Sequence, residues 1–389
     1  MSVTAAKGFV AAGIHCGVKP SGDLDLSLVA TADGRPVSAA AVFTDNKMTA
    51  APVLTSDAHL GATRGHAAAV ILNSGNANAA TGGPGRADAE AMCATTATAL
   101  GCAANDVLVC STGLIGIPLP IDVILAGIPQ VAAARSADGA AEAAQAICTT
   151  DTYRKEALVS VGDTGAVVGG MAKGAAMLSP NMATMLAVLT TDAEVEPDDL
   201  RAMLRAAVAT SFNVLMTGAC RSTNDTVIVL ASGAAGPVPL EELAAALAQA
   251  CAELAGQMAG DAEGATKVVK FTVSGAASDA DAEAGARQVA RSALCKCSWF
   301  GQDPYWGRLA SEIGSAGIAF DQERVSSTYG GIRVAARGVS IAHDEAAVAA
   351  HMAQRHLDIG VDLGLGTGAF TVLTNDLTHA YIDENTGGS

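Results

Sequence analysis

The sequence predicts a mixed α/β protein whose layered sheets lie between helices. Short apolar runs bounded by turn residues occur along the whole chain and are typical of buried strands. Ala-rich segments with helical spacing separate several of these runs. Strands and helices do not alternate strictly, so layered sheets explain the pattern better than one doubly wound sheet does. With 389 residues, the chain is long enough to bury a large core in one or two domains.

The predicted elements follow from local pattern and end signals. The helix expected over 196–210 carries acidic residues in its first turn, where the positive end of the helix dipole favours them. In chain order, strands are expected over 26–32, 38–44, 67–73, 106–112, 157–162, 165–170, 185–190, 225–232, 267–275, 357–363 and 368–374. Helices are expected over 85–100, 120–134, 138–148, 196–210, 239–258, 278–294 and 344–355.

The composition argues against two classes of protein. The formal net charge is −16, and because so acidic a surface repels phosphate backbones, nucleic-acid binding is not expected. No apolar stretch approaches the roughly 20 residues that a membrane helix needs. The first residues lack the apolar block of a secretory signal. We therefore expect a cytoplasmic protein without a membrane partner.

Neither a metal site nor a redox site is predicted. The nine cysteines are scattered, and the close pair Cys295 and Cys297 matches neither a zinc knuckle nor a C-x-x-C redox motif. We expect reduced thiols that pack as small hydrophobic side chains. His351 and His356 are five residues apart, so they do not share a helix face as a metal-binding pair would.

Several polar segments after predicted elements could carry chemistry. Segment 73–85, NSGNANAATGGPG, is too rich in Gly and Asn for regular structure; it is either a tight turn or a loop of free backbone donors, and it is not a P-loop. Segment 111–116, STGLIG, is either a plain turn or an oxyanion hole. Segment 149–152, TTDT, suits a helix stop with Asx-type turns. In segment 261–267, Glu263 and Lys267 form either a surface ion pair or a holder for a zwitterionic ligand.

Residues 173–190, KGAAMLSPNMATMLAVLT, place a threonine between a Pro-Asn turn and an apolar run. Thr184 is either a packing residue at the start of a strand or a nucleophile positioned where that strand begins. A threonine hydroxyl is a weak nucleophile unless a base lies beside it. The sequence has no G-x-S-x-G motif and little support for a Ser-His-Asp arrangement, so the residues alone leave both alternatives open.

Together, these segments resemble the ornithine acetyltransferase family, whose members are bifunctional glutamate N-acetyltransferases and amino-acid acetyltransferases. The resemblance runs nearly from end to end of the chain, with the motifs in the family's order. Its most specific part is the KG-x-x-M-x-x-PNMATML motif within 173–190. The other motifs are GFVAAGIHCGVK, NSGNANAATG, STGLIG, TTDT, SFN followed by STNDTV, DAEGATK, FGQDPYWGR and DLTHAYIDEN.

The resemblance implies that the chain cuts itself at the Ala183–Thr184 bond. The products would be an α chain of residues 1–183 and a β chain of residues 184–389, which form one interlocked catalytic unit and assemble as α2β2. The implied fold is that of the peptidase/ornithine-acetyltransferase group, convergent with N-terminal nucleophile hydrolases. Cleavage frees the α-amine of Thr184, whose reference pKa of about 7.7–8.0 leaves much of it neutral near physiological pH. One residue then supplies both nucleophile and base.

The implied reaction is ping-pong transfer of an acetyl group from N2-acetylornithine to glutamate in arginine biosynthesis, through an acetyl ester on Thr184. Thr112 and the N–H of Gly113 are the implied oxyanion hole. No cofactor or metal is implied, and the resemblance allows acetyl-CoA as a co-substrate. The implied substrate-binding residues are Thr150, Lys173, Thr184, Glu263, Asn385 and Ser389.

Two segments depart from the family's pattern. The family usually reads close to VDGDTSTND, whereas this chain reads TGACRSTND, so two acidic positions are lost and Arg221 is gained. TNDLT replaces the usual Gly-Cys-Asp-Leu-Thr near the C-terminus. Two alternatives therefore accompany the main hypothesis. One is a related Thr-nucleophile amidohydrolase or acyltransferase with a different acyl donor, and the other is a silent relative in which Thr184 is only a strand residue.

Overall fold

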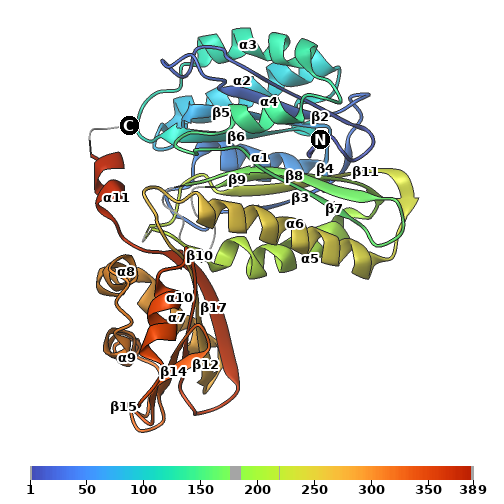
Figure 1. Ribbon diagram of the computed structural model, residues 1–389. Helices are drawn as coiled ribbons and strands as arrows, with labels where there is room; N and C mark the ends of the chain where they lie inside the picture. The colour runs from blue at the N-terminus through green and yellow to red at the C-terminus, as the bar shows by residue number, and fades with distance from the viewer. Residues whose placement is uncertain (1, 176–184, 219, 387–389) are drawn as a thin grey trace. The chain divides into compact units, whose positions relative to one another are not determined.

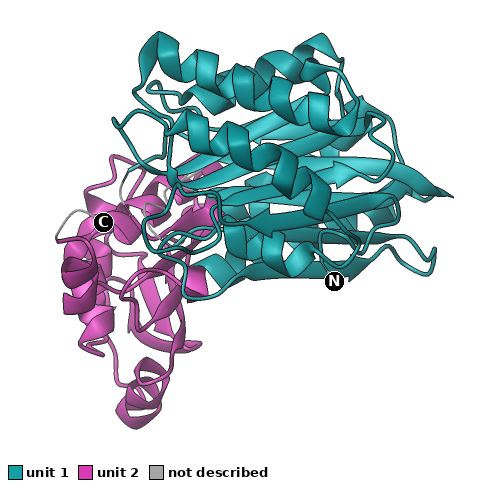
Figure 2. Cartoon of the chain, turned by 90° about the horizontal axis from the view of Figure 1, so that it is seen from above, with its two compact units in different colours: residues 1–213, 220–258 teal, residues 214–219, 259–389 magenta. Residues whose placement is uncertain are grey.

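A computed structural model describes residues 2–175, 185–218 and 220–386. The strands of these residues form three sheets with helices packed against them (Figure 1). The chain divides into two compact units (Figure 2): unit 1 comprises residues 1–213 and 220–258, and unit 2 comprises residues 214–219 and 259–389. The predicted mixed α/β class with layered sheets is confirmed. The predicted chain boundary at 183/184 lies outside the described residues.

The first sheet of unit 1 has the strand order β1-β2-β5-β6. β2 runs antiparallel to both of its neighbours, and β6 runs parallel to β5. Helices α2 and α3 cover its outer face (Figure 1). The elements are β1 (Phe9–Ile14), β2 (Leu26–Thr31), β5 (Ala69–Asn76), β6 (Val107–Leu114), α2 (Gly82–Leu100) and α3 (Ile121–Ala134).

The second sheet of unit 1 has the order β4-β3-β11-β9-β8-β7. β9 lies in its interior, parallel to β11 and antiparallel to β8. Helices α1 and α4 pack between the two sheets, and α5 and α6 lie on the outer face (Figure 1). The strands are β3 (Val37–Phe43), β4 (His66–Ala67), β7 (Lys155–Ser160), β8 (Val167–Lys173), β9 (Leu186–Glu194) and β11 (Thr226–Pro237). The helices are α1 (Ala51–Ala62), α4 (Ala140–Ala146), α5 (Pro197–Thr210) and α6 (Leu240–Gly260).

The main core of unit 1 lies between its two sheets. Val70 and Leu108 of the first sheet belong to the same buried cluster as Val188 and Ile228 of the second. β9 is buried at every position except Glu194, because helices or another sheet cover both of its faces. Burial on two faces explains why the sequence shows a continuous apolar run here and not an alternating pattern.

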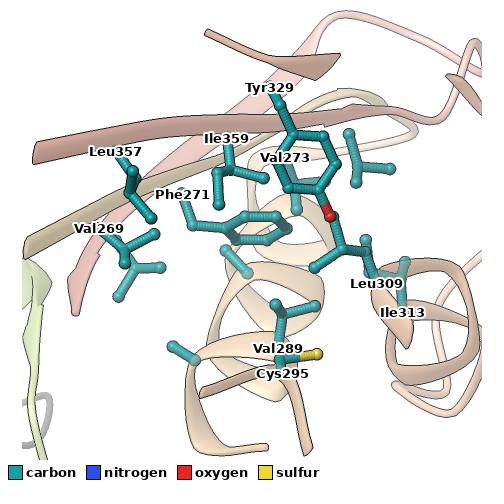
Figure 3. Packing of buried hydrophobic residues seen from close by; sticks show 14 of the residues in the cluster. Val269, Phe271, Val273, Val289, Cys295, Leu309, Ile313, Tyr329, Leu357 and Ile359 are labelled. Atoms are coloured by element: carbon teal, nitrogen blue, oxygen red, sulfur yellow. The ribbon is translucent and has the colours of Figure 1, made fainter. Parts of the chain in front are cut away.

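Unit 2 is built on a sheet with the order β10-β17-β12-β16-β13-β14-β15. Its core packs Phe271, Ile359 and Tyr329 of the sheet against Val289 of α7 (Figure 3). The strands are β10 (Leu215–Met216), β12 (Val268–Ala276), β13 (Ser326–Tyr329), β14 (Ile332–Ala336), β15 (Val339–Ser340), β16 (His356–Asp362) and β17 (Gly368–Asn375). The helices are α7 (Asp279–Arg291), α8 (Ala293–Phe300), α9 (Trp306–Gly314), α10 (Glu345–Met352) and α11 (His379–Glu384).

Every predicted strand and helix is confirmed, with ends that shift by a few residues. The sequence patterns missed α1, α8, α9 and α11, together with the short or partly exposed strands β1, β4, β10, β13, β14 and β15. Two short 3-10 helices, Ala104–Asp106 and Phe212–Val214, complete the described elements. In the described part of the chain, no helix has both the length and the apolar character needed to cross a membrane.

Candidate active site

The two Gly-containing segments predicted as turns or loops lie side by side at the ends of β5 and β6. The two strands run parallel, and Thr112 is paired with Ser74. The first four residues of each segment are strand, so the prediction that the 73–85 segment is irregular throughout is wrong. Long-range partners explain the difference, because the Ser111 hydroxyl donates to Asn73 Oδ1 over 2.6 Å and satisfies two buried polar groups.

The predicted oxyanion residues, Thr112 and Gly113, are adjacent on β6. Thr112 is buried. Gly113 has a φ of 134°, and a Cβ on it would lie 2.3 Å from the carbonyl carbon of Gly75. Only glycine permits this approach of two backbones. The oxyanion role of the pair stays a prediction.

We expect Gly113→Ala to destabilise the fold more than Gly101→Ala does. Both glycines have a positive φ, so alanine strains the backbone at each position by about 1–2 kcal/mol. At Gly101 a Cβ meets no atom within 4 Å, whereas at Gly113 it meets the backbone of Gly75. Overpacking adds about 1–3 kcal/mol at Gly113 alone. Thermal unfolding of the two variants measures the difference, and equal losses would contradict the role of the Gly75 contact.

The TTDT segment is organised by the buried carboxylate of Asp151. This carboxylate accepts the N–H of Thr149 (3.0 Å), the N–H of Gly174 (2.7 Å) and the ammonium group of Lys155 (2.6 Å). Burial alone would raise the pKa of Asp151, but the ammonium groups of Lys173 and Lys155 lower it well below its usual range. The Thr149 bond joins Asp151 to the N–H two residues before it, whereas an Asx-type turn uses the N–H two residues after the acid, so this bond is not the predicted turn. The role of Asp151 as the centre of this cluster was not predicted.

Lys173, a predicted substrate-binding residue, belongs to the same cluster. It is the last residue of β8, it is 2% exposed, and its Cα is paired with Leu186 of β9. Its ammonium group donates to the Thr149 hydroxyl over 2.7 Å and lies 3.7 Å from Asp151 Oδ2. Leu186 is the second residue after Thr184 in the chain. The fold therefore brings Lys173 to the strand that follows the predicted nucleophile.

A lysine from a distant segment reaches the same loop. The ammonium group of Lys19 donates to the carbonyl of Cys148 over 2.6 Å and to the carbonyl of Leu24 over 2.8 Å. Burial lowers the pKa of Lys19. Thr150, a predicted substrate contact, is exposed two residues beyond Cys148. The loop that carries Thr150 is thus held between Lys19 and Lys173.

The STND segment connects the end of β6 to the start of β9. The side-chain amide of Asn224 donates to the carbonyl of Ser111 over 2.9 Å, and Asp225 Oδ1 accepts the N–H of Met185 over 2.8 Å. Asp225 is fully buried, and its Oδ2 has no hydrogen-bond partner within the described ranges. Burial raises the pKa of this carboxyl well above its usual range. The sequence patterns gave Asp225 no site role, although an acidic residue directly before a buried apolar run is a signal.

Two predicted substrate-binding residues of unit 2 contact each other. Nδ2 of Asn385 donates to Oε2 of Glu263 over 2.9 Å. The proposed surface ion pair between Glu263 and Lys267 is wrong. Lys267 is buried, and its ammonium group donates to the carbonyls of Met352 (2.9 Å) and Gln354 (2.7 Å). Those two carbonyls hold the ammonium group of Lys267 inside unit 2, so it does not form a surface ion pair with Glu263.

Three predicted site residues, Ala183, Thr184 and Ser389, lie outside the described residues. Within the described ranges, no group of three or more His, Cys, Asp or Glu side chains is arranged to hold a metal ion. The candidate site of unit 1 therefore consists of the ends of β5, β6 and β8, the TTDT loop, and the residues that bond Met185.

Comparison with known proteins identifies the family. A model of the ArgJ family matches residues 10–387 of the chain. The chain belongs to the ArgJ family. Over its full length it is 49% identical to the arginine biosynthesis bifunctional protein ArgJ of Mycolicibacterium paratuberculosis, of which 96% is covered. It is 45% identical to the protein of the same name from Streptomyces coelicolor, of which 100% is covered.

A crystal structure of the Mycobacterium tuberculosis ornithine acetyltransferase complexed with ornithine is also similar. The identity is 44% and the TM-score is 0.41, and the match covers 46% of this chain and 94% of that chain. The full-length relatives and the ArgJ family match confirm the predicted family, and with it the prediction of an acetyltransferase of arginine biosynthesis.

Proposed function

We propose that this ArgJ-family enzyme transfers the acetyl group of N2-acetylornithine to glutamate through an acetyl ester on Thr184. The observation that carries the proposal is the bridge made by Asn224 and Asp225. Asn224 bonds Ser111, the residue before Thr112, whereas Asp225 bonds Met185, the residue after Thr184. Neighbouring side chains thus link the strand of the oxyanion candidate to the segment that follows the nucleophile, as acyl transfer requires.

The same threonine is proposed to cut the precursor first. Thr184 Oγ attacks the carbonyl carbon of Ala183, and the peptide C–N bond breaks as its nitrogen takes a proton and becomes the α-amine. Water then hydrolyses the resulting ester, which frees the Ala183 carboxylate and the Thr184 hydroxyl. In the cut protein, β9 and β11 of the β chain stay paired with β8 and β3 of the α chain. These ladders support the predicted interlocking of the two chains.

In the transfer reaction, the neutral α-amine takes the hydroxyl proton of Thr184 while Oγ attacks the acetyl carbon of N2-acetylornithine. The oxyanion of the tetrahedral intermediate accepts hydrogen bonds from the Thr112 hydroxyl and the Gly113 N–H. The protonated amine returns the proton to the leaving nitrogen, the C–N bond breaks, and ornithine departs. Glutamate then attacks the acetyl ester through its own amine, which yields N-acetylglutamate and restores Thr184.

Substrate binding is proposed on the residues that the family resemblance names. Lys173 binds a carboxylate of the substrate, and Thr150 contacts the substrate from the TTDT loop. Glu263, Asn385 and Ser389 keep their predicted binding roles on the resemblance. The resemblance also supports an α2β2 assembly and acetyl-CoA as a second acetyl donor. A cytoplasmic location is proposed from the sequence pattern, and no cofactor is proposed.

Intact mass spectrometry and a radiolabelled acetyl donor test this proposal together. We expect two chains, produced by cleavage after residue 183. The acetyl label from N2-acetylornithine should be retained on the chain that begins at Thr184. Added glutamate is expected to discharge the label into N-acetylglutamate. Discharge by water at the same rate without glutamate would favour an amidohydrolase. A single unlabelled chain would favour the silent relative, and either result would overturn the proposal.

A further inference from the structure

Two ammonium groups from distant segments converge on the loop that carries Thr150. Lys19 donates to the carbonyl of Cys148 over 2.6 Å, and Lys173 donates to the hydroxyl of Thr149 over 2.7 Å. Consecutive residues of the loop are therefore bonded by two different lysines. Bringing two positive charges to neighbouring atoms is unfavourable unless an anion lies close to them.

The buried carboxylates beside these lysines are already engaged. Asp151 Oδ1 lies 2.6 Å from the ammonium group of Lys155, and only its Oδ2 faces Lys173, at 3.7 Å. Asp25, which also attracts Lys19, accepts the backbone N–H groups of residues 16–19 at 2.6–3.1 Å. Three lysines thus share two buried carboxylates, and the other acid that attracts Lys19, Asp23, is exposed. The excess positive charge suits a bound anion.

Among the described residues, Lys19 has partners for only two of its donors, which leaves one for such an anion. An ammonium group has three N–H donors, and the carbonyls of Cys148 and Leu24 occupy two of them on Lys19. The residue is half-buried, so part of it is open to solvent and to a ligand. The two carbonyl bonds fix the position of the nitrogen, which reduces the entropy lost when a ligand binds.

We propose that this third donor of Lys19 binds the α-carboxylate of the amino-acid substrate beside Lys173. The inference rests on the proposed function, because that function supplies an amino-acid substrate. N2-acetylornithine and glutamate share the α-carboxylate, so Lys19 serves both halves of the transfer. Lys19 is then a specificity residue for the carboxylate and takes no part in moving the acetyl group.

Steady-state kinetics of Lys19→Met test the inference. We expect the KM values for N2-acetylornithine and for glutamate to rise by about 10- to 100-fold, the loss typical of one charge-assisted hydrogen bond. The kcat values should change by less than about threefold, because the interaction is present in ground state and transition state alike. Lys270→Met is the matched control, because Lys270 is an exposed lysine of unit 2 whose side chain is 57% exposed. Its KM values should equal those of the unaltered enzyme.

A substrate analogue separates carboxylate binding from a purely structural clamp. The analogue is N2-acetylornithine with its α-carboxylate replaced by a carboxamide. The unaltered enzyme should bind the carboxamide weakly. Lys19→Met should not weaken that binding further, because the carboxamide already lacks the carboxylate that Lys19 would bind. Lys19→Arg, which keeps the charge, should restore most of the preference for the carboxylate.

Two results would overturn the inference about Lys19. One is an unchanged KM for both natural substrates, and the other is an equal rise in KM for the substrate and its carboxamide, which would leave Lys19 only a loop clamp. If Lys19→Met does not fold, Lys19→Gln gives the same comparison. Absence of acetyl exchange in the unaltered enzyme would instead refute the proposed function, so the two failures are distinguishable.

Discussion

A Thr184→Ala variant is expected to remain a single chain of 38.6 kDa and to lose acetyl transfer. The substitution removes the hydroxyl that attacks in both proposed reactions, so the precursor stays uncut and no acetyl ester forms. Loss of a nucleophile typically lowers turnover by roughly 10⁴-fold or more. Denaturing electrophoresis measures the first outcome, and acetyl exchange between N2-acetylornithine and glutamate measures the second.

Thr98→Ala is the matched control for this experiment. Thr98 lies exposed on α2, and its hydroxyl donates to the carbonyl of Ala94 in the same helix. The control should therefore be cut and active like the unaltered enzyme. Thr184→Ser should keep both activities at a lower rate, since a hydroxyl and an α-amine remain. Exchange at the normal rate by Thr184→Ala would show that another residue is the nucleophile.

The elements that could be predicted from the sequence are those whose burial shows in the local pattern. The run 185–190 predicted β9 because the strand is covered on both faces and its side chains are apolar throughout most of its length. Helix α1 was missed for the opposite reason. It packs between two sheets and buries polar as well as apolar residues, among them Ser56 and His59, so no apolar stripe marks it.

The chemistry of the candidate site was predictable by motif, but its geometry was not. The resemblance named Thr112, Gly113 and Lys173, and the fold brings each of them to the end of a strand in unit 1. It did not name Asp225, because the bond to Met185 joins residues 40 positions apart. No local pattern records such a pairing. Likewise, β5 continues past its predicted end at Asn73, whose side chain bonds Ser111, 38 residues away.

Asp151→Asn is expected to lower the free energy of unfolding by about 3–5 kcal/mol at pH 7. The substitution leaves two buried ammonium groups, those of Lys155 and Lys173, without their carboxylate. This loss of unfolding free energy should become smaller as the pH falls. The pKa of Asp151 is lower in the folded state than its unfolded value of about 3.9, so its stabilisation is complete above about pH 5. It is lost as the pH falls towards the folded pKa.

The stability difference between the parent chain and Asp151→Asn should therefore be constant above about pH 5 and shrink in acid. Urea unfolding from pH 3 to pH 7 measures this difference. All samples carry Thr184→Ala, so that every chain is uncut.

The stability of Asp225→Asn should depend on pH with the opposite sign. Burial raises the folded pKa of Asp225, so its carboxyl destabilises the parent increasingly as the pH rises from about 4. Over that rise in pH, Asp225→Asn should gain stability relative to the parent. If the stability difference between the parent and Asp151→Asn did not change with pH, Asp151 would not hold its lysines as a carboxylate.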